Sequence, residues 1–124
     1  MPALAVAEPD RGSALTVAVA RIAEFWGLNN TRLGVILGLS APTISRLKRG
    51  VSQIDPASKS FEAGQFLLRL FRSLDALLGS DDAAVKSWLE TPNLDLGGRP
   101  INRIETIRGL IEVCDYVDFY RARV

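Results

Sequence analysis

The 124-residue sequence contains no histidine and only one cysteine, Cys114. A single cysteine cannot form an intramolecular disulfide, and without histidine it has no obvious base partner for nucleophilic chemistry. Histidine-bearing catalytic triads, and metal sites made of histidine or of several cysteines, are excluded by the same composition. Cys114 stands among apolar neighbours, and free cysteine packs as a small hydrophobe, so we expect it in the core.

The sequence also lacks a long hydrophobic run. No stretch approaches the roughly 20 apolar residues needed to span a bilayer. The start, "MPALAVAEPDRG", has no basic segment ahead of its apolar residues. We therefore expect no signal peptide, no membrane partner and a cytoplasmic location.

The chain has little net charge, because 15 basic residues face 14 acidic ones, for a formal charge of +1. The charge is nevertheless unevenly spread. Residues 31–50 contain Arg32, Arg46, Lys48 and Arg49 and no acid. A compact cationic segment favours a phosphate-bearing partner, although four charges alone are a weak signal.

Apolar residues recur at helical spacing and no useful strand alternation is present, which predicts an all-α protein. Capping residues and glycines mark the helix ends, including Ser13 as the first N-cap. The expected helices span 14–26, 31–37, 41–49, 57–78, 82–90 and 100 to the C-terminus, the last with a break near 105–106. We expect a flexible tail at 1–12, a three-helix unit at 13–55 and a C-terminal helical unit at 56–124.

The stretch "GLSAPTISRLKRG" at 38–50 has the features of a helix-turn-helix. Gly34 supplies the small residue at which two helices cross, Gly38 supplies the turn, and Ser40 caps the second helix. Ile44 and Leu47 are spaced to face inward. This pattern predicts a DNA-binding unit, with a solvated basic face on an ordinary core helix as the alternative.

The side chains left on the outside of this second helix suit DNA. Arg46 is expected to read guanine in the major groove, and Thr43 and Ser45 to donate to bases or phosphates. Arg32, Lys48 and Arg49 are expected to neutralise phosphates. The predicted DNA-binding residues are Arg32, Ser40, Thr43, Ser45, Arg46, Lys48 and Arg49.

One departure from this pattern is the apolar pair Val35 and Ile36, where the first helix of such a motif usually exposes polar residues. Contact of two neighbouring apolar side chains with water is unfavourable, so such a pair tends to be covered by another surface. We expect it to be covered by the C-terminal unit, by a second subunit or by another protein.

The C-terminal half shows no catalytic arrangement. Its acidic residues are dispersed, and the pair Gly97 and Gly98 lacks the Lys-Ser/Thr of a phosphate-binding loop. We therefore expect no enzyme activity, no cofactor, no metal and no small-molecule substrate, and we interpret the two glycines as a turn.

"WLETPNLDLGGRPI", followed by the glycine of "TIRGLIEV", resembles the toxin-binding domain of the MbcA/ParS/Xre antitoxin family. Residues 31–50 resemble the helix-turn-helix of the Xre (Cro/CI-like) family. The residues that carry the C-terminal resemblance are Trp88, Leu89, Pro92, Asn93, Leu96, Gly97, Gly98, Pro100 and Gly109.

This resemblance implies an antitoxin of a type II toxin-antitoxin system. It implies that the partner is a RES-domain toxin, which degrades NAD or transfers its ADP-ribose. It also implies a homodimer that represses its own operon by binding operator DNA, and that blocks the toxin's NAD site with its C-terminal portion. The alternative is a stand-alone helix-turn-helix repressor, whose C-terminal domain only dimerises or senses a ligand.

The end of the sequence, "DYVDFYRARV", independently favours a partner surface, because aromatic residues and arginine are enriched at binding hot spots. One helix face cannot bury all of its large side chains, since successive residues lie about 100° apart. Tyr116 and Val117 fit the core and the partner surface equally well. The predicted toxin-binding residues are Phe119, Tyr120, Arg121, Arg123 and Val124.

Overall fold

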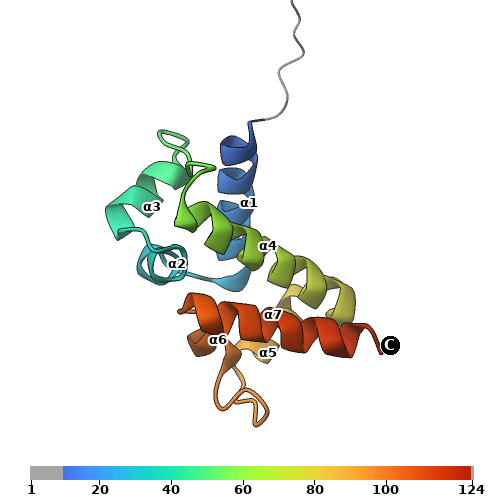
Figure 1. Ribbon diagram of the computed structural model, residues 1–124. Coiled ribbons are helices and arrows are strands. Elements are labelled where there is room, and N and C mark those ends of the chain that lie inside the picture. The colour runs from blue at the N-terminus through green and yellow to red at the C-terminus, as the bar shows by residue number, and fades with distance from the viewer. Residues whose placement is uncertain (1–9, 124) are drawn as a thin grey trace, which may run out of the picture.

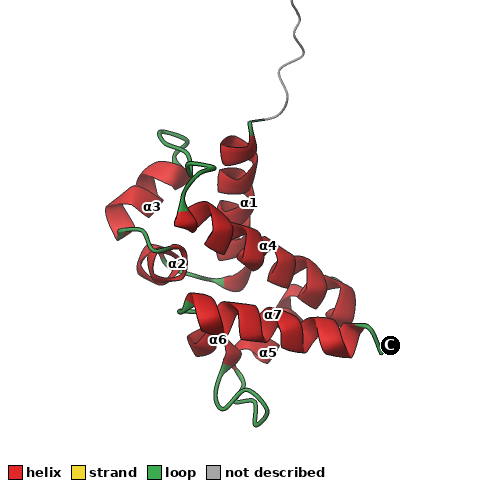
Figure 2. Ribbon diagram, in the orientation of Figure 1, coloured by secondary structure: helices red, strands yellow, loops and turns green. Residues whose placement is uncertain are grey.

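The protein is all-α, as the sequence predicts. A computed structural model describes residues 10–123, and within that range it contains seven helices and no strand (Figures 1 and 2). The helices are α1 (Arg11–Trp26), α2 (Asn30–Leu37), α3 (Ala41–Lys48), α4 (Lys59–Leu78), α5 (Asp82–Glu90), α6 (Pro100–Arg103) and α7 (Ile107–Arg121).

The helix starts are set by side-chain caps. The Asn29 side chain accepts from the backbone N–H of Arg32, so α2 begins one residue earlier than predicted. Ser58 caps α4 in the same way, which places that start two residues later than expected. Ser40 caps α3 as predicted.

The first helix begins before Ser13, which is therefore not its N-cap. The Asp10 carboxylate accepts from the N–H of Gly12 at 3.0 Å and takes the capping role. Thr16 Oγ1 donates to the Gly12 carbonyl at 2.6 Å and accepts from the N–H of Ile54 at 2.9 Å. The first turn of α1 is thus tied to the segment that follows α3. Residues 1–9 of the expected tail lie outside the described residues.

Helix α4 is the centre of the molecule. It packs against α1, α2, α5 and α7, and Figure 1 shows it crossing between the α1–α3 region and the α5–α7 region. Its inner residues Leu67, Leu70 and Leu74 have no solvent exposure. The two expected units therefore share one hydrophobic core, which α4 runs through.

Helical spacing predicts that Ile104, Ile107, Ile111 and Cys114 form the inner face of the last helix, and the structure differs from this. Ile104 is buried as expected, but Ile107 is 47% exposed and Ile111 is only half-buried. The chain breaks after α6, and Thr106 caps a new helix by accepting from the N–H of Gly109. This restart shifts the helical phase. The face that packs on α4 consists of Leu110, Val113, Cys114 and Val117.

Cys114 is a core residue, as predicted. Its thiol has no exposure and donates to the Phe66 carbonyl on α4, with 3.3 Å between sulfur and oxygen. Burial raises the pKa of Cys114 to about 11. The neutral thiol is not the form that attacks electrophiles.

A polar clamp closes the outer edge of the α4–α7 contact. The Arg69 guanidinium donates to the carboxylates of Asp115 at 3.3 Å and Asp118 at 2.6 Å, and the Ser73 hydroxyl donates to Asp118. Burial works against ionisation of Asp118, but the hydrogen bonds from Ser73 and Arg69 hold its pKa below the usual value.

None of the described helices is long and apolar enough to cross a bilayer.

Candidate functional site

The turn between α2 and α3 is built for a close helix crossing. A Cβ added to Gly34 would lie 2.3 Å from the Leu39 carbonyl oxygen, so no larger residue fits there. Gly38 ends α2 in the left-handed conformation, with φ of 72°. Ile44 and Leu47 of α3 are buried as predicted. Their burial fixes which face of α3 looks outward.

The outward face of α3 carries the predicted reading residues. Thr43 and Ser45 are half-buried, and Arg46 and Arg49 are exposed. Thr43, Arg46 and Arg49 are three residues apart, which places them along one stripe of the helix. No carboxylate within residues 10–123 forms an ion pair with Arg46, Lys48 or Arg49.

Hydrogen bonds order the start of this stripe. The hydroxyls of Ser40 and Thr43 lie 2.8 Å apart, and Arg46 donates to the Thr43 hydroxyl at 3.1 Å. Ser40 Oγ also accepts from the Thr43 N–H, so its main role is to cap the helix. The Arg46 guanidinium keeps free donors, because Thr43 engages only one of its N–H groups.

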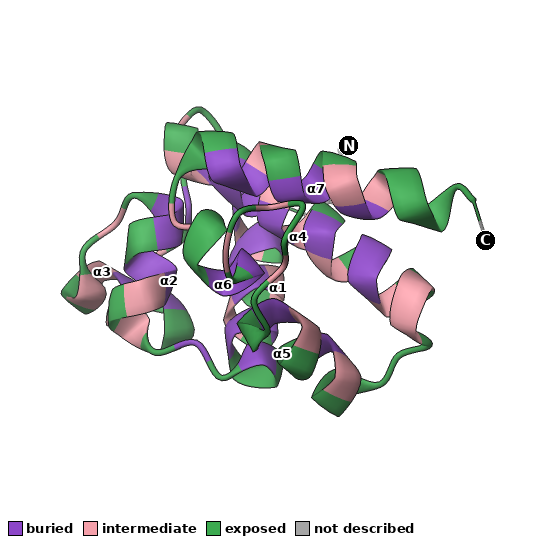
Figure 3. Cartoon of the chain, turned by 90° about the horizontal axis from the view of Figure 1, so that it is seen from below, coloured by how far each residue is buried: buried purple, intermediate pink, exposed green. Residues whose placement is uncertain are grey.

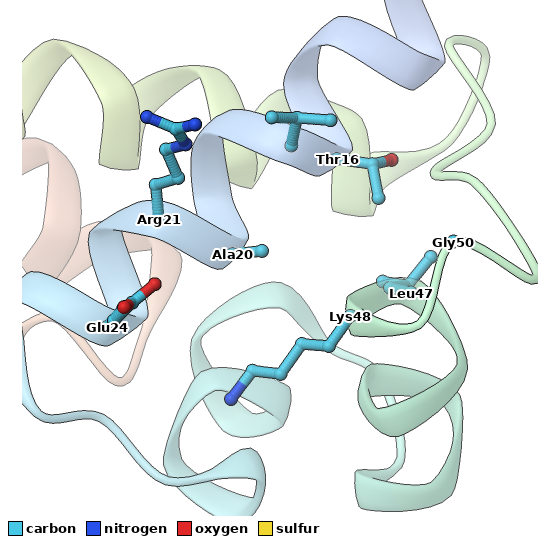
Figure 4. Close-up of a pocket in the computed structure, with 8 residues that line it drawn as sticks. Thr16, Ala20, Arg21, Glu24, Leu47, Lys48 and Gly50 are labelled. Atoms are coloured by element: carbon cyan, nitrogen blue, oxygen red, sulfur yellow. The ribbon is translucent and has the colours of Figure 1, made fainter.

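Lys48 lies away from the stripe. It lines a shallow groove of about 460 Å³ between the end of α3 and the outer side of α1, together with Leu47 and Gly50 (Figure 4). Glu24 and Arg21 line the opposite side of the groove. This geometry follows from the two-residue step between Arg46 and Lys48, which is about 200° around a helix.

Arg32, which the sequence analysis places at a phosphate, has partners within the chain. Its Nε donates to the Glu105 carboxylate at 3.2 Å, and its terminal nitrogen donates to the Asn102 side chain at 2.6 Å. Both partners belong to the C-terminal region. Arg32 therefore ties α2 to the segment between α6 and α7, and its charge is neutralised within the chain.

Of the apolar pair on α2, only Val35 is exposed. Ile36 is 5% exposed and belongs to the core, so the expectation that the C-terminal unit covers the pair holds for Ile36 but not for Val35. Contacts between α2 and α4 explain this burial. Val35 lines a groove of about 430 Å³ that Ile107 of α7 and Ala63 of α4 also line.

The end of α7 presents an aromatic and cationic surface beyond the packed part of the helix. Phe119 and Tyr120 are 53% and 43% exposed, and Arg121 and Arg123 are exposed (Figure 3). The Arg123 guanidinium sits 4.3 Å from the centre of the Phe119 ring, and the Phe119 and Tyr120 rings meet edge to face. Val124 lies outside the described residues.

Tyr116 and Val117, which the sequence leaves open, have different environments. Val117 has no exposure and belongs to the core. Tyr116 is half-buried and packs between Trp88 and Tyr120 in tilted contacts, with ring centres 6.4 Å and 4.9 Å away. Together with Leu77, these residues line an apolar hollow of about 230 Å³ at the base of the exposed end.

The loop between α5 and α6 is a structured feature that the sequence analysis describes only as a turn. Asn93 and Gly98 pair through two backbone hydrogen bonds of 2.9 and 3.1 Å. Leu94, at the tip, is fully exposed at 101%, whereas Leu96 packs against the core. The spacing in "NLDLGG" does not indicate which of the two leucines faces solvent, because the turn that separates their environments is set by contacts with other segments.

Two families match the chain. Residues 5–72 match the antitoxin Xre-like helix-turn-helix domain. Residues 73–123 match the antitoxin Xre/MbcA/ParS C-terminal toxin-binding domain. The two matches meet within α4, and neither family is enzymatic. No curated protein matches the chain.

Proposed function

Since the chain belongs to the Xre/MbcA/ParS antitoxin family, we propose that it neutralises a RES-type, NAD-consuming toxin by direct binding and represses its own operon. The matched domains support an antitoxin with a DNA-binding half and a toxin-binding half. The identity of the toxin, the mode of inhibition and the operator are the parts that we propose.

The proposed mode of inhibition is based on the residues at the end of α7. Phe119, Tyr120 and Arg123 lie past the last residue that packs in the core, Val117. Their rings and guanidinium are already arranged by mutual contact, so binding immobilises few additional rotors. We propose that these residues enter the NAD cleft of the toxin and exclude the substrate sterically. The antitoxin then acts by stoichiometric binding and performs no reaction.

The proposed mode of DNA binding is based on the exposed stripe of α3 that contains Thr43, Arg46 and Arg49. Arg46 reads a base edge, and Thr43, Ser45 and Arg49 contact flanking bases or phosphates. Lys48, on the groove side of α3, contributes less than a residue of the stripe. Arg32 is left out of the DNA contacts, because Glu105 and Asn102 already occupy it.

Operator binding of this kind requires two copies. A homodimer sets two recognition helices about 34 Å apart, which matches one turn of DNA and predicts a palindromic site. We propose that the groove lined by the exposed residues Val35 and Ile107 is the dimer interface, because both side chains are apolar and lie outside the core.

The test of inhibition uses the chain shortened after Asp118, produced together with the toxin encoded beside it. NAD consumption is measured on the purified complex. Because residues 119–124 fill the cleft in our proposal, the shortened antitoxin is expected to bind the toxin and leave it active. A chain lacking residues 2–9 is the matched control for shortening a terminus and is expected to inhibit fully.

Full inhibition by the chain shortened after Asp118 rejects occlusion by the terminus. If the complete chain binds its promoter fragment but no neighbouring gene product, the stand-alone repressor is the correct function instead.

A further inference from the structure

Leu94 is the most exposed large hydrophobic residue of the described chain, at 101%. It lies at the tip of the loop between α5 and α6, which projects from the helical body (Figures 1 and 2). Single exposed leucines are ordinary on protein surfaces, so the exposure alone indicates nothing. What distinguishes Leu94 is the structure that holds it and the surface to which it is joined.

The loop that carries Leu94 is held by hydrogen bonds on both flanks. Asn93 Oδ1 accepts from the N–H groups of Asp95 at 3.0 Å and Leu96 at 3.2 Å, which closes an Asx turn around the tip. The Leu94 carbonyl accepts from Gly97 N–H at 3.3 Å. The base is fixed by Arg99, whose Nε donates to the carbonyl of Glu90 at 2.7 Å. The backbone around Leu94 is thus ordered before any partner arrives.

The same loop is joined to the end of α7. The Tyr116 hydroxyl donates to the Asp95 carboxylate at 2.9 Å, and the Asn93 side-chain amide lies 3.4 Å from that hydroxyl. Tyr116 in turn packs against Tyr120 in a tilted contact, next to Phe119. Asp95 and Tyr116 therefore link the loop that carries Leu94 to the hollow and to the exposed terminus through one series of contacts. All of it lies within the matched toxin-binding domain.

We propose that Leu94 is a preformed apolar anchor for the toxin, which seats in an apolar pocket on the toxin's surface outside the NAD cleft. This inference rests on the proposed function, in which the end of α7 occupies the cleft. The anchor supplies affinity, while the terminus supplies inhibition. We assign the toxin as the partner because Tyr116 contacts both the loop, through Asp95, and the terminus, through Tyr120. One bound protein can therefore contact the loop and the terminus together.

The chemistry fits an anchor of this type. A leucine on a convex, ordered tip buries most of its side chain in a concave apolar site, and it loses little backbone freedom on binding. Its neighbour Asp95 has one carboxylate oxygen engaged by the Tyr116 hydroxyl, which ties that side chain to α7. The contact is therefore expected to be apolar and insensitive to salt.

The experiment measures the affinity of full-length Leu94→Ala and Leu94→Asp for the immobilised toxin encoded beside this chain. We expect Leu94→Ala to weaken binding roughly 10-fold, because alanine retains only part of the apolar area that leucine buries. Leu94→Asp should weaken it further. At saturating concentration both variants should still inhibit fully, since the terminus is intact. Val51→Ala, which alters an exposed apolar residue of the DNA-binding half, is the matched control and should bind as wild type.

Wild-type affinity in both Leu94 variants overturns the anchor while leaving the proposed function intact. Failure of the wild-type chain itself to bind the toxin is the separate result that rejects the proposed function. The mass of the free chain in solution is measured alongside. If the Leu94 variants lose a dimer and keep their toxin affinity, Leu94 is a self-association residue and the anchor is rejected. Leu94 is fully exposed, so the substitutions remove no buried side chain, and thermal melting of each variant verifies its folding.

Discussion

Arg32 of α2 and Glu105, which precedes α7, form an ion pair with 3.2 Å between Nε and the carboxylate oxygen. Asn102 completes the contact through a second hydrogen bond to the same guanidinium. The pair joins two segments that are 73 residues apart in sequence and belong to the two functional halves. The position of Arg32 in the cationic segment favours phosphate binding. In the structure, however, Arg32 joins the DNA-binding half to the toxin-binding half.

Arg32→Ala is expected to leave the salt dependence of operator binding unchanged. A phosphate contact would reduce the slope of log K against log salt by roughly 0.9, whereas an internal ion pair contributes nothing to it. The free energy of unfolding should fall by no more than about 1 kcal/mol, because both side chains are a third exposed. Salt titration of operator binding and urea unfolding measure the two effects. A shallower salt slope for Arg32→Ala would show that Arg32 contacts a DNA phosphate.

Arg46→Ala and Arg49→Ala are expected to weaken DNA binding in different ways. Loss of a bidentate base contact by Arg46 should remove about 1–3 kcal/mol of discrimination between operator and scrambled DNA. Loss of a phosphate contact by Arg49 should weaken both DNAs alike and reduce the salt slope by roughly 0.9. Fluorescence anisotropy with both duplexes separates these outcomes. Equal loss on both DNAs for Arg46→Ala would make it a phosphate contact.

Lys48→Ala is the matched control for these arginine variants, since it removes a charge from the same helix on the groove side. It should change operator affinity less than Arg49→Ala does. A larger effect for Lys48 would show that the groove between α1 and α3, and not the stripe, faces the phosphates.

Asp118→Asn is expected to destabilise the fold at neutral pH and to matter less in acid. The pKa of Asp118 is lower in the folded chain than its ordinary value of about 4, so its stabilising contribution is present above that value. The contribution is lost as the pH falls through the lowered folded-state pKa. Urea midpoints of wild type and variant should therefore differ at pH 7 and converge towards pH 3.

Asp115→Asn is the control for the clamp, because the Asp115 side chain is 67% exposed and makes only one 3.3 Å contact with Arg69. It should shift the midpoint less than Asp118→Asn. A difference between wild type and Asp118→Asn that is constant from pH 7 to pH 3 would show that the carboxylate charge is not what stabilises the contact.

Local signals in the sequence were sufficient for most of the helix boundaries. Ser40 caps its helix, and Gly38 adopts the conformation that ends the preceding one, as expected from residue type alone. The inward faces of short helices also followed from spacing, since Ile44 and Leu47 are buried. These features depend on neighbours within about four residues, which the sequence displays directly.

Features that depend on distant residues were not predictable in this way. Ile36 is buried because α4 packs on α2, and Ile107 is exposed because a cap at Thr106 restarts the last helix in a new phase. The role of Arg32 depends on Glu105, and the prominence of Leu94 depends on a loop that Tyr116 supports from another helix.

The sequence by itself determined an all-α chain with a helix-turn-helix, a free cysteine in the core and an aromatic, arginine-rich end. The tertiary structure decided which of the cations remain available to DNA and which apolar residues remain available to a partner. The physical reason is that capping and periodicity are short-range properties of the chain, whereas burial and ion pairing are set by which helices pack together.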